Sequence, residues 1–189
     1  MERKEKIFNM ADKRLQIKFE RSLSLIDEYF LCNKEAIHLD FIKSINCLFE
    51  IAKKQQEQGV KRDIAYMNIC FLRTSFLTES YDFMASLYDD KFYVETTETR
   101  IYFNLNFIFE HINRDIEEIE EEIKIFPTLK KFEIKELKFS YAQYYFIYAM
   151  KIIKELCEDI EEKINCRDLK ITEDFKIIVG GHMEEGLKL

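Results

Sequence analysis

The chain has 189 residues, of which 47% are hydrophobic and 34% charged, and its 29 basic and 36 acidic residues give a net charge of −7. This length suffices for one domain with a sizeable core, and the negative charge disfavours nucleic acid as a general ligand because it opposes the phosphate backbone. The chain has only four glycines and one proline. A many-stranded β-sandwich or barrel would need more of these turn-forming residues, so a mainly α-helical fold is favoured.

Two segments with helical spacing open the chain. Apolar side chains recur at steps of three and four from Leu15 to Phe30 and predict a helix over residues 10–32. The same spacing from Ile37 to Ala52 predicts a second helix over residues 35–57. The polar stretch "KKQQEQ" and Gly59 then supply a stop signal.

The middle of the chain is predicted to hold a central helix. After Asp63, a residue type favoured at helix N-caps, "IAYMNICFLRTSFL" is apolar over most of a helical circumference. The following "ESYDFMASLYDD" is expected to continue as helix. The segment "KFYVETTETRIYFN" alternates aromatic or β-branched residues with polar ones and predicts an optional short β-hairpin near residues 91–104.

Two longer helices are predicted next. Isoleucines at steps of three and four mark one helix from Leu105 to Ile123, which Pro127 ends. Residues 133–164 repeat the helical spacing after a short connection, so these two helices should pack antiparallel as a helical hairpin. The C-terminal "KIIV" is expected to be either a strand or an apolar anchor.

The fold class expected from these patterns is mainly α: one domain over residues 1–189, a bundle of about five helices. Five cysteines, an odd number without a CxxC pair, suggest neither a disulfide framework nor a zinc site. No apolar run of signal-peptide or membrane-spanning length is found, so we expect a cytoplasmic protein without membrane contact.

Arg73 stands inside the predicted central helix, where its neighbours at three and four residues are apolar or thiol side chains. An unpaired buried charge costs several kcal/mol. Arg73 is therefore expected either to bond within its own fold or to anchor an anion or a protein partner.

Residues 110–124 hold seven acidic and two basic residues. Clustered carboxylates can imitate a phosphate track and so occupy a basic groove on another macromolecule. The partner-binding residues predicted on this helix are Glu117, Glu118, Glu121 and Glu122. Their role depends on these side chains being open to solvent.

A metal site is the alternative use of these carboxylates. Carboxylates and imidazoles could converge from two helices, at Glu35, His38, Glu110, His111 and Asp115. Ferritin-like dimetal bundles use two Glu-x-x-His pairs, and this chain has one such spacing, Glu35 to His38. We therefore expect no metal and no cofactor, and a solvated acidic face.

Aromatic residues are in surplus, with 17 Phe and 10 Tyr. Tyr144 and Phe146 fall off the apolar stripe of their helix, and Tyr93 and Tyr102 lie in the predicted hairpin. We expect Tyr93, Tyr102 and Tyr144 to contribute to a protein-binding patch, because exposed aromatic side chains are typical of interfaces.

The stretches "FLRTSFLTESYDF", "YDDKFYVE" and "FIFEHI" resemble pieces of an uncharacterised family of small proteins from low-GC Gram-positive bacteria. The resemblance covers the middle third of the chain and implies a bacterial or mobile-element origin. It implies no activity and no catalytic residue.

The function expected from the sequence is a non-enzymatic protein-binding module, more narrowly an inhibitor or immunity-type protein. Its expected partner is another protein, such as a nucleic-acid-binding enzyme or a toxin, with no direct contact to nucleic acid. The alternatives are a carboxylate and histidine metal-binding helical enzyme and a structural protein that self-associates, for example as a homodimer.

Overall fold

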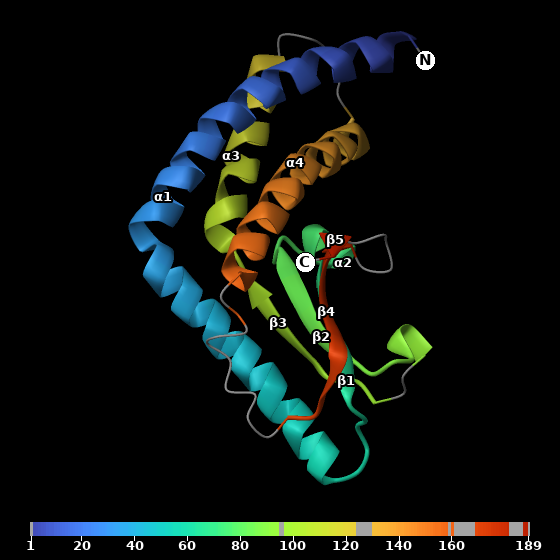
Figure 1. Ribbon diagram of the computed structural model, residues 1–189. Coiled ribbons are helices and arrows are strands. Elements are labelled where there is room, and N and C mark those ends of the chain that lie inside the picture. The colour runs from blue at the N-terminus through green and yellow to red at the C-terminus, as the bar shows by residue number, and fades with distance from the viewer. Residues whose placement is uncertain are drawn as a thin grey trace. The chain divides into compact units, whose positions relative to one another are not determined.

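The computed structural model describes residues 2–94, 97–123, 130–158, 160, 169–181 and 187–188 (Figure 1). Along this part of the chain, four α-helices and a five-stranded sheet are formed. The elements are α1 (Glu2–Glu57), β1 (Ile64–Phe71), α2 (Arg73–Leu77), β2 (Asp82–Tyr88), the 3₁₀ turn η1 (Phe92–Val94), β3 (Arg100–Asn104), α3 (Asn106–Ile123), α4 (Lys131–Cys157), β4 (Ile171–Gly181) and β5 (Leu187–Lys188). The mainly α-helical class is confirmed, whereas the bundle of about five helices is not.

The chain divides into two compact units. Unit 1 comprises residues 1–33 and 105–149, and unit 2 comprises residues 34–104 and 150–189. Helices α1 and α4 each run through both units. The single domain expected from the sequence stays a prediction, and the units are described separately below.

Helix α1 is continuous where two helices were predicted. The expected break near residues 33–34 is wrong, since the helix passes through "LCNKEA", which contains neither glycine nor proline. Asn33, a residue type that can end a helix, instead donates its side-chain amide to the carbonyl of Tyr29 at 2.8 Å within the same helix.

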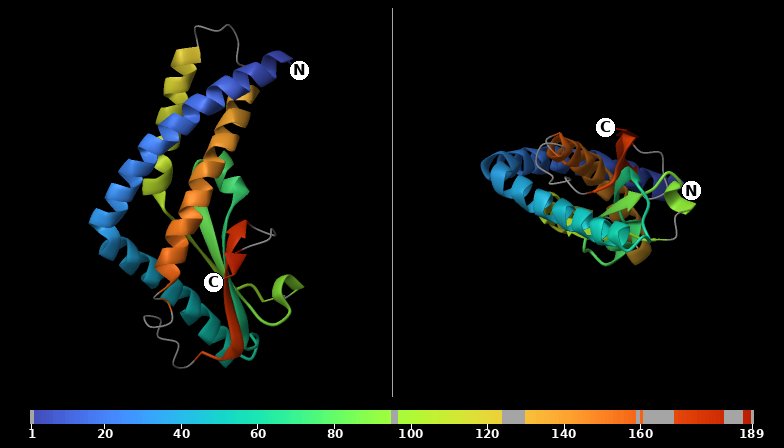
Figure 2. Two further views of the ribbon diagram at one scale, coloured as in Figure 1. Left: turned by 45° about the horizontal axis from the view of Figure 1, so that its top comes forward. Right: turned by 60° about the horizontal axis from the view of Figure 1, so that its bottom comes forward.

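Unit 1 is built from the first part of α1, α3 and the first part of α4, which lie side by side in two views (Figures 1 and 2). Phe109 packs against Phe146 at 5.1 Å between ring centroids, and Asp115 bonds to Tyr141. The earlier residue of α3 contacts the later residue of α4, and the later residue of α3 contacts the earlier one, so the two helices run antiparallel. The predicted helical hairpin is confirmed. The core of unit 1 includes Leu15, Ile26, Ile108, Ile112, Ile119, Tyr141 and Tyr145.

Unit 2 contains the mixed sheet, with strand order β3-β2-β1-β4-β5. Strands β2 and β3 and strands β1 and β2 pair antiparallel, while β1 and β4 pair parallel. One sheet face packs on the second part of α1, where Phe41 meets Phe103 edge to face at 5.5 Å.

The predicted central helix over residues 63–77 is wrong over residues 64–71, which form strand β1, whereas residues 73–77 are helical as α2. Seven of the eight residues of β1 are buried, on both faces of the sheet. A strand buried on both faces reads as a continuous apolar run, which periodicity alone does not separate from a buried helix.

The hairpin expected near residues 91–104 is partly wrong. Its second half is β3, but residues 92–94 form η1, and β3 pairs instead with β2. Strand β2 was expected to be helical and is also buried on both faces. The "KIIV" segment lies in β4, so its interpretation as a strand is confirmed.

The helix predicted over residues 133–164 corresponds to α4, which spans Lys131–Cys157. Residues 161–164 of that prediction lie outside the described residues. No helix in the described ranges combines the length and the apolar character needed to cross a membrane.

Candidate functional site

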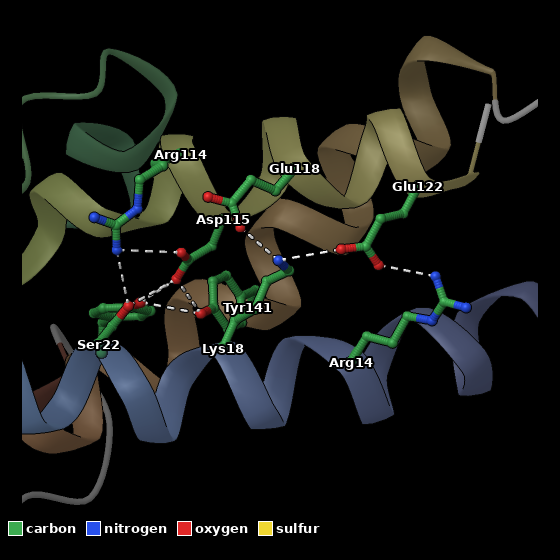
Figure 3. A network of polar contacts seen from close by, with 9 residues as sticks. Arg14, Lys18, Ser22, Arg114, Asp115, Glu118, Glu122 and Tyr141 are labelled. Atoms are coloured by element: carbon green, nitrogen blue, oxygen red, sulfur yellow. Dashed lines mark hydrogen bonds and ion pairs between the residues drawn. The ribbon is translucent and has the colours of Figure 1, made fainter.

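The glutamates at the C-terminal end of α3 do not share one environment. Glu118 and Glu122 lie on the flank that faces α1, and both form ion pairs with it (Figure 3). Lys18 Nζ lies 2.6 Å from Glu118 Oε2 and 3.4 Å from Glu122 Oε1, and Arg14 Nη1 lies 2.9 Å from Glu122 Oε2.

This pairing changes the acidity of both partners. Burial lowers the pKa of Lys18, but its bonds to Glu118 and Glu122 outweigh burial, so the pKa of Lys18 is raised. The hydrogen bond and charge of Lys18 lower the pKa of Glu118. Glu118 and Glu122 remain exposed, but they are paired with α1. The expectation that all four glutamates are free to dock on a partner is therefore wrong at these two residues.

Glu117 and Glu121 are exposed. Among the described residues, neither has an ion-pair partner. Glu110 precedes Glu117 by seven residues and lies on the same helix side. We call Glu110, Glu117 and Glu121 the acidic row.

Asp115 is the one acid of α3 that is directed into unit 1, and it is 3% exposed. Its Oδ2 accepts hydrogen bonds from Ser22 Oγ at 3.0 Å, Tyr141 OH at 2.7 Å and Tyr145 OH at 3.0 Å. Arg114 lies at the edge of the cluster, with Nη2 3.5 Å from Asp115 Oδ1 (Figure 3). The carboxylate is thus solvated by hydroxyl groups from α1 and α4 in place of water.

The Asp115 cluster is closed to solvent. Tyr141 and Tyr145 are 1% and 0% exposed. Burial is the main cause that raises the pKa of both phenols far above the usual value. The buried hydrogen bonds of this cluster therefore join α1, α3 and α4 inside unit 1.

The residues of the alternative metal site belong to different units of the chain. Glu35 and His38 lie in the part of α1 that belongs to unit 2, whereas Glu110, His111 and Asp115 lie on α3 in unit 1. Across the described residues, no group of three or more His, Cys, Asp or Glu side chains could hold a metal ion.

His111 stands beside Glu110, with Nε2 3.6 Å from Oε1. Burial is the main cause that lowers the pKa of His111, with a contribution from the charge of Arg114. Because Asp115 is turned toward hydroxyl groups, it is not a second ligand beside this imidazole.

The aromatic residues expected on the surface are mostly packed. Tyr144 is half-buried, and its ring is tilted against that of Phe19 at 5.5 Å between centroids. Its hydroxyl donates to Asp12 at 3.4 Å and accepts from the side-chain amide of Gln16 at 3.3 Å. Phe146 is 2% exposed. The expectation of an exposed Phe146 is therefore wrong, because α3 covers it, whereas Tyr144 keeps part of its surface open and its role as a partner residue stays a prediction.

Three of the predicted partner-binding residues, Arg73, Tyr93 and Tyr102, belong to unit 2. Tyr102 is 53% exposed on β3, as an interface residue would be, and Arg100 lies over its ring at 5.9 Å from the centroid. The side chain of Tyr93 lies outside the described residues. Arg73 is exposed at the first position of α2, so the expectation that it stands inside an apolar helix is wrong.

A row of exposed apolar side chains on α4 was missed by the sequence interpretation. Phe132, Phe139 and Ile147 are 57%, 37% and 63% exposed. Their spacing of seven and eight residues, two helical turns each, places them on one side of the helix, away from the buried Tyr141 and Tyr145. This spacing was the signal that could have identified the set, which we call the outer row.

No protein-family model, curated protein or solved structure matches this chain.

Proposed function

We propose that this protein is a non-enzymatic protein-binding module that holds its partner on the outer row of α4. The proposal is supported by the exposure of Phe132, Phe139 and Ile147 on the side of α4 opposite the buried Tyr141 and Tyr145. Aligned apolar side chains in solvent are the usual sign of a surface that another molecule covers.

The charges beside the outer row favour an acidic partner. Lys131 and Lys135 are exposed on the same end of α4, and Lys130 Nζ lies 5.8 Å from the centroid of the Phe132 ring. A partner segment with an apolar stripe and flanking carboxylates would complement both features, because charge complementarity selects partners and the apolar contacts hold them.

An inhibitor or immunity-type role is a second candidate function, which uses a different surface and a partner of the opposite charge. It would use the acidic row, where Glu117 and Glu121 have no ion-pair partner among the described residues, to cover a basic surface of a nucleic-acid-binding enzyme or toxin. The double variant Glu117→Gln/Glu121→Gln should then weaken inhibition of that enzyme. Glu118→Gln/Glu122→Gln is the matched control, since those two carboxylates are engaged with α1.

The main proposal is tested by affinity capture with quantitative mass spectrometry, followed by titration of the purified partner. Ile147→Ser in α4 is compared with Ile17→Ser in α1, because the two isoleucines are 63% and 68% exposed. A partner retained by the wild type and by Ile17→Ser but lost with Ile147→Ser supports the proposal. Equal binding by both variants and by Phe132→Ser/Phe139→Ser contradicts it.

A further inference from the structure

Strand β3 lies at an edge of the sheet of unit 2. Its only strand neighbour among the described residues is β2. Arg100, Tyr102 and Asn104 are exposed, whereas Ile101 and Phe103 are half-buried. An edge strand presents unpaired backbone groups to which a further strand can bond.

The ladder between β2 and β3 shows which backbone groups face that edge. Leu87 donates its N–H to the carbonyl of Thr99 at 2.9 Å, and the register then pairs Ala85 with Ile101. In an antiparallel ladder, directly opposed residues exchange hydrogen bonds at every second pair. Residues 99, 101 and 103 therefore bond to β2, while Arg100, Tyr102 and Asn104 direct N–H and C=O outward.

The usual protections of an edge strand are weak in β3. Between Arg100 and Asn104 there is no proline or lysine, and the pairing with β2 is regular. The strand carries one charge, Arg100, which is the first residue and is paired with Glu98 Oε2 at 2.9 Å. This edge is therefore able to accept another strand.

We propose that a second copy of this chain docks on β3, so that two β3 strands pair antiparallel about a two-fold axis at Tyr102. Tyr102 then lies opposite Tyr102 of the other copy, and Arg100 opposite Asn104. All of these residues have outward backbone groups, so each opposed pair exchanges two hydrogen bonds. Such an interface is isologous and closes as a dimer.

The side chains favour this register over the alternatives. Pairing centred on Tyr102 opposes two aromatic rings and places no like charges face to face, and cross-strand aromatic pairs are stabilising. A shift of two residues loses one of the three bonded pairs, and pairing centred on Arg100 opposes two guanidinium groups. Because the contact involves only a short strand from each copy, the dimer is expected to be weak and concentration-dependent.

Sedimentation equilibrium of the full chain over a range of concentrations tests this dimer. Tyr102→Pro removes the central outward N–H without removing a bond to β2, since that N–H points away from β2. It should raise the dimer dissociation constant by at least about tenfold. Tyr102→Val, which keeps the donor and a β-favouring side chain, should raise it less. A wild-type protein that is monomeric throughout, or a proline variant that dimerises equally well, overturns the proposal.

Disulfide trapping tests the register independently and does not rely on the proline variant folding. Opposed residues of a bonded pair lie about 5.5 Å apart between Cα atoms, within the range that a disulfide spans. Arg100→Cys mixed with Asn104→Cys should give a linked peptide between the new cysteines, identified by mass spectrometry because Cys32 and Cys47 are also exposed. Absence of this link, or equally ready linking of Arg100→Cys to itself, contradicts pairing centred on Tyr102.

Discussion

The hydroxyl of Tyr141 donates a hydrogen bond of 2.7 Å to Oδ2 of Asp115, and both side chains are almost fully removed from solvent. Two further hydroxyls, of Ser22 and Tyr145, share the same oxygen. A buried charge with this many donors is stabilised only as long as the donors stay in place. The arrangement therefore couples α1, α3 and α4 through one atom.

Removal of the carboxylate should destabilise the protein strongly. Asp115→Ala leaves three buried hydroxyls without their acceptor and is expected to lower the free energy of unfolding by about 3 kcal/mol or more. Asp115→Asn keeps an acceptor oxygen and should lower it less. Urea denaturation measures both, and an alanine variant as stable as the wild type would show that the hydroxyls find other acceptors.

Tyr141→Phe removes one donor to a charged acceptor and should cost about 1.5–3 kcal/mol of unfolding free energy. Tyr144→Phe is the matched control, because its half-buried hydroxyl bonds to Asp12 at a longer 3.4 Å. The control should lose less than about 1 kcal/mol. Equal losses in the two variants would contradict a special role of the buried carboxylate.

Stability should also fall at alkaline pH. The pKa values of Tyr141 and Tyr145 are raised in the folded protein, mainly by burial, so above the usual tyrosine pKa of about 10 the unfolded chain loses protons that the folded chain retains. The stabilisation that comes from these protonated phenols is fully present below that pH and is lost as the pH rises above it. Denaturant unfolding across this range should show the decline, and Tyr141→Phe should show a shallower one.

The ion pairs between α1 and α3 should contribute little to the unfolding free energy. Lys18→Met is expected to lower the unfolding free energy by less than about 1 kcal/mol, because Glu118 and Glu122 remain half exposed and are screened. Since the pKa of Glu118 is lowered in the folded state, this contribution is present above the usual glutamate pKa of about 4.3 and is lost as the pH falls below it.

The matched control for Lys18→Met is Lys13→Met, and the unfolding free energy of both variants is measured by denaturant unfolding at low and at high salt. Lys13 is exposed, and the described residues supply no ion-pair partner for it. The difference between the two variants should shrink in high salt. If the unfolding free energies of the two variants differ by several kcal/mol, the ion pairs of Lys18 stabilise the protein more than their exposure indicates.

Gln56 joins the end of α1 to the sheet. Its amide donates to the carbonyls of Arg62 and Lys170, both at 2.8 Å, and accepts from the N–H of Lys170 at 2.9 Å. Gln56→Ala should lower the unfolding free energy by about 1–3 kcal/mol. The exposed Gln58, changed to Ala, should have an effect within about 0.5 kcal/mol, and thermal unfolding compares the two.

The cysteines should differ in reactivity. Burial raises the pKa of Cys70 to about 11 and of Cys157 to about 12, so near neutral pH few of these thiols are in the reactive thiolate form. Cys32 and Cys47 are exposed. Iodoacetamide followed by peptide mass spectrometry should find Cys32 and Cys47 modified first, and early modification of Cys70 would show that β1 opens readily.

The amphipathic helices were predictable from local pattern. The isoleucines of α3 line one helix side, and a helix that buries one side shows its period in the sequence. In α4, the steps of three and four were enough to predict the helix, although apolar residues also lie on its other sides. The antiparallel pairing of α3 and α4 followed from their short connection. These features depend on residues close in the chain, so the sequence alone determined them.

The sheet, the fate of the glutamates and the surface aromatics were decided only by the tertiary structure. Strand β1 is enclosed on both faces, so its residues carry no period that distinguishes a strand from a helix. Glu118 and Glu117 are neighbours in sequence, yet only Glu118 meets Lys18, a hundred residues away. Asp115 lies three residues after Ile112 and four before Ile119, on the apolar side of α3. Its buried carboxylate is stabilised there by hydrogen bonds from hydroxyl groups of α1 and α4, which are distant in the sequence.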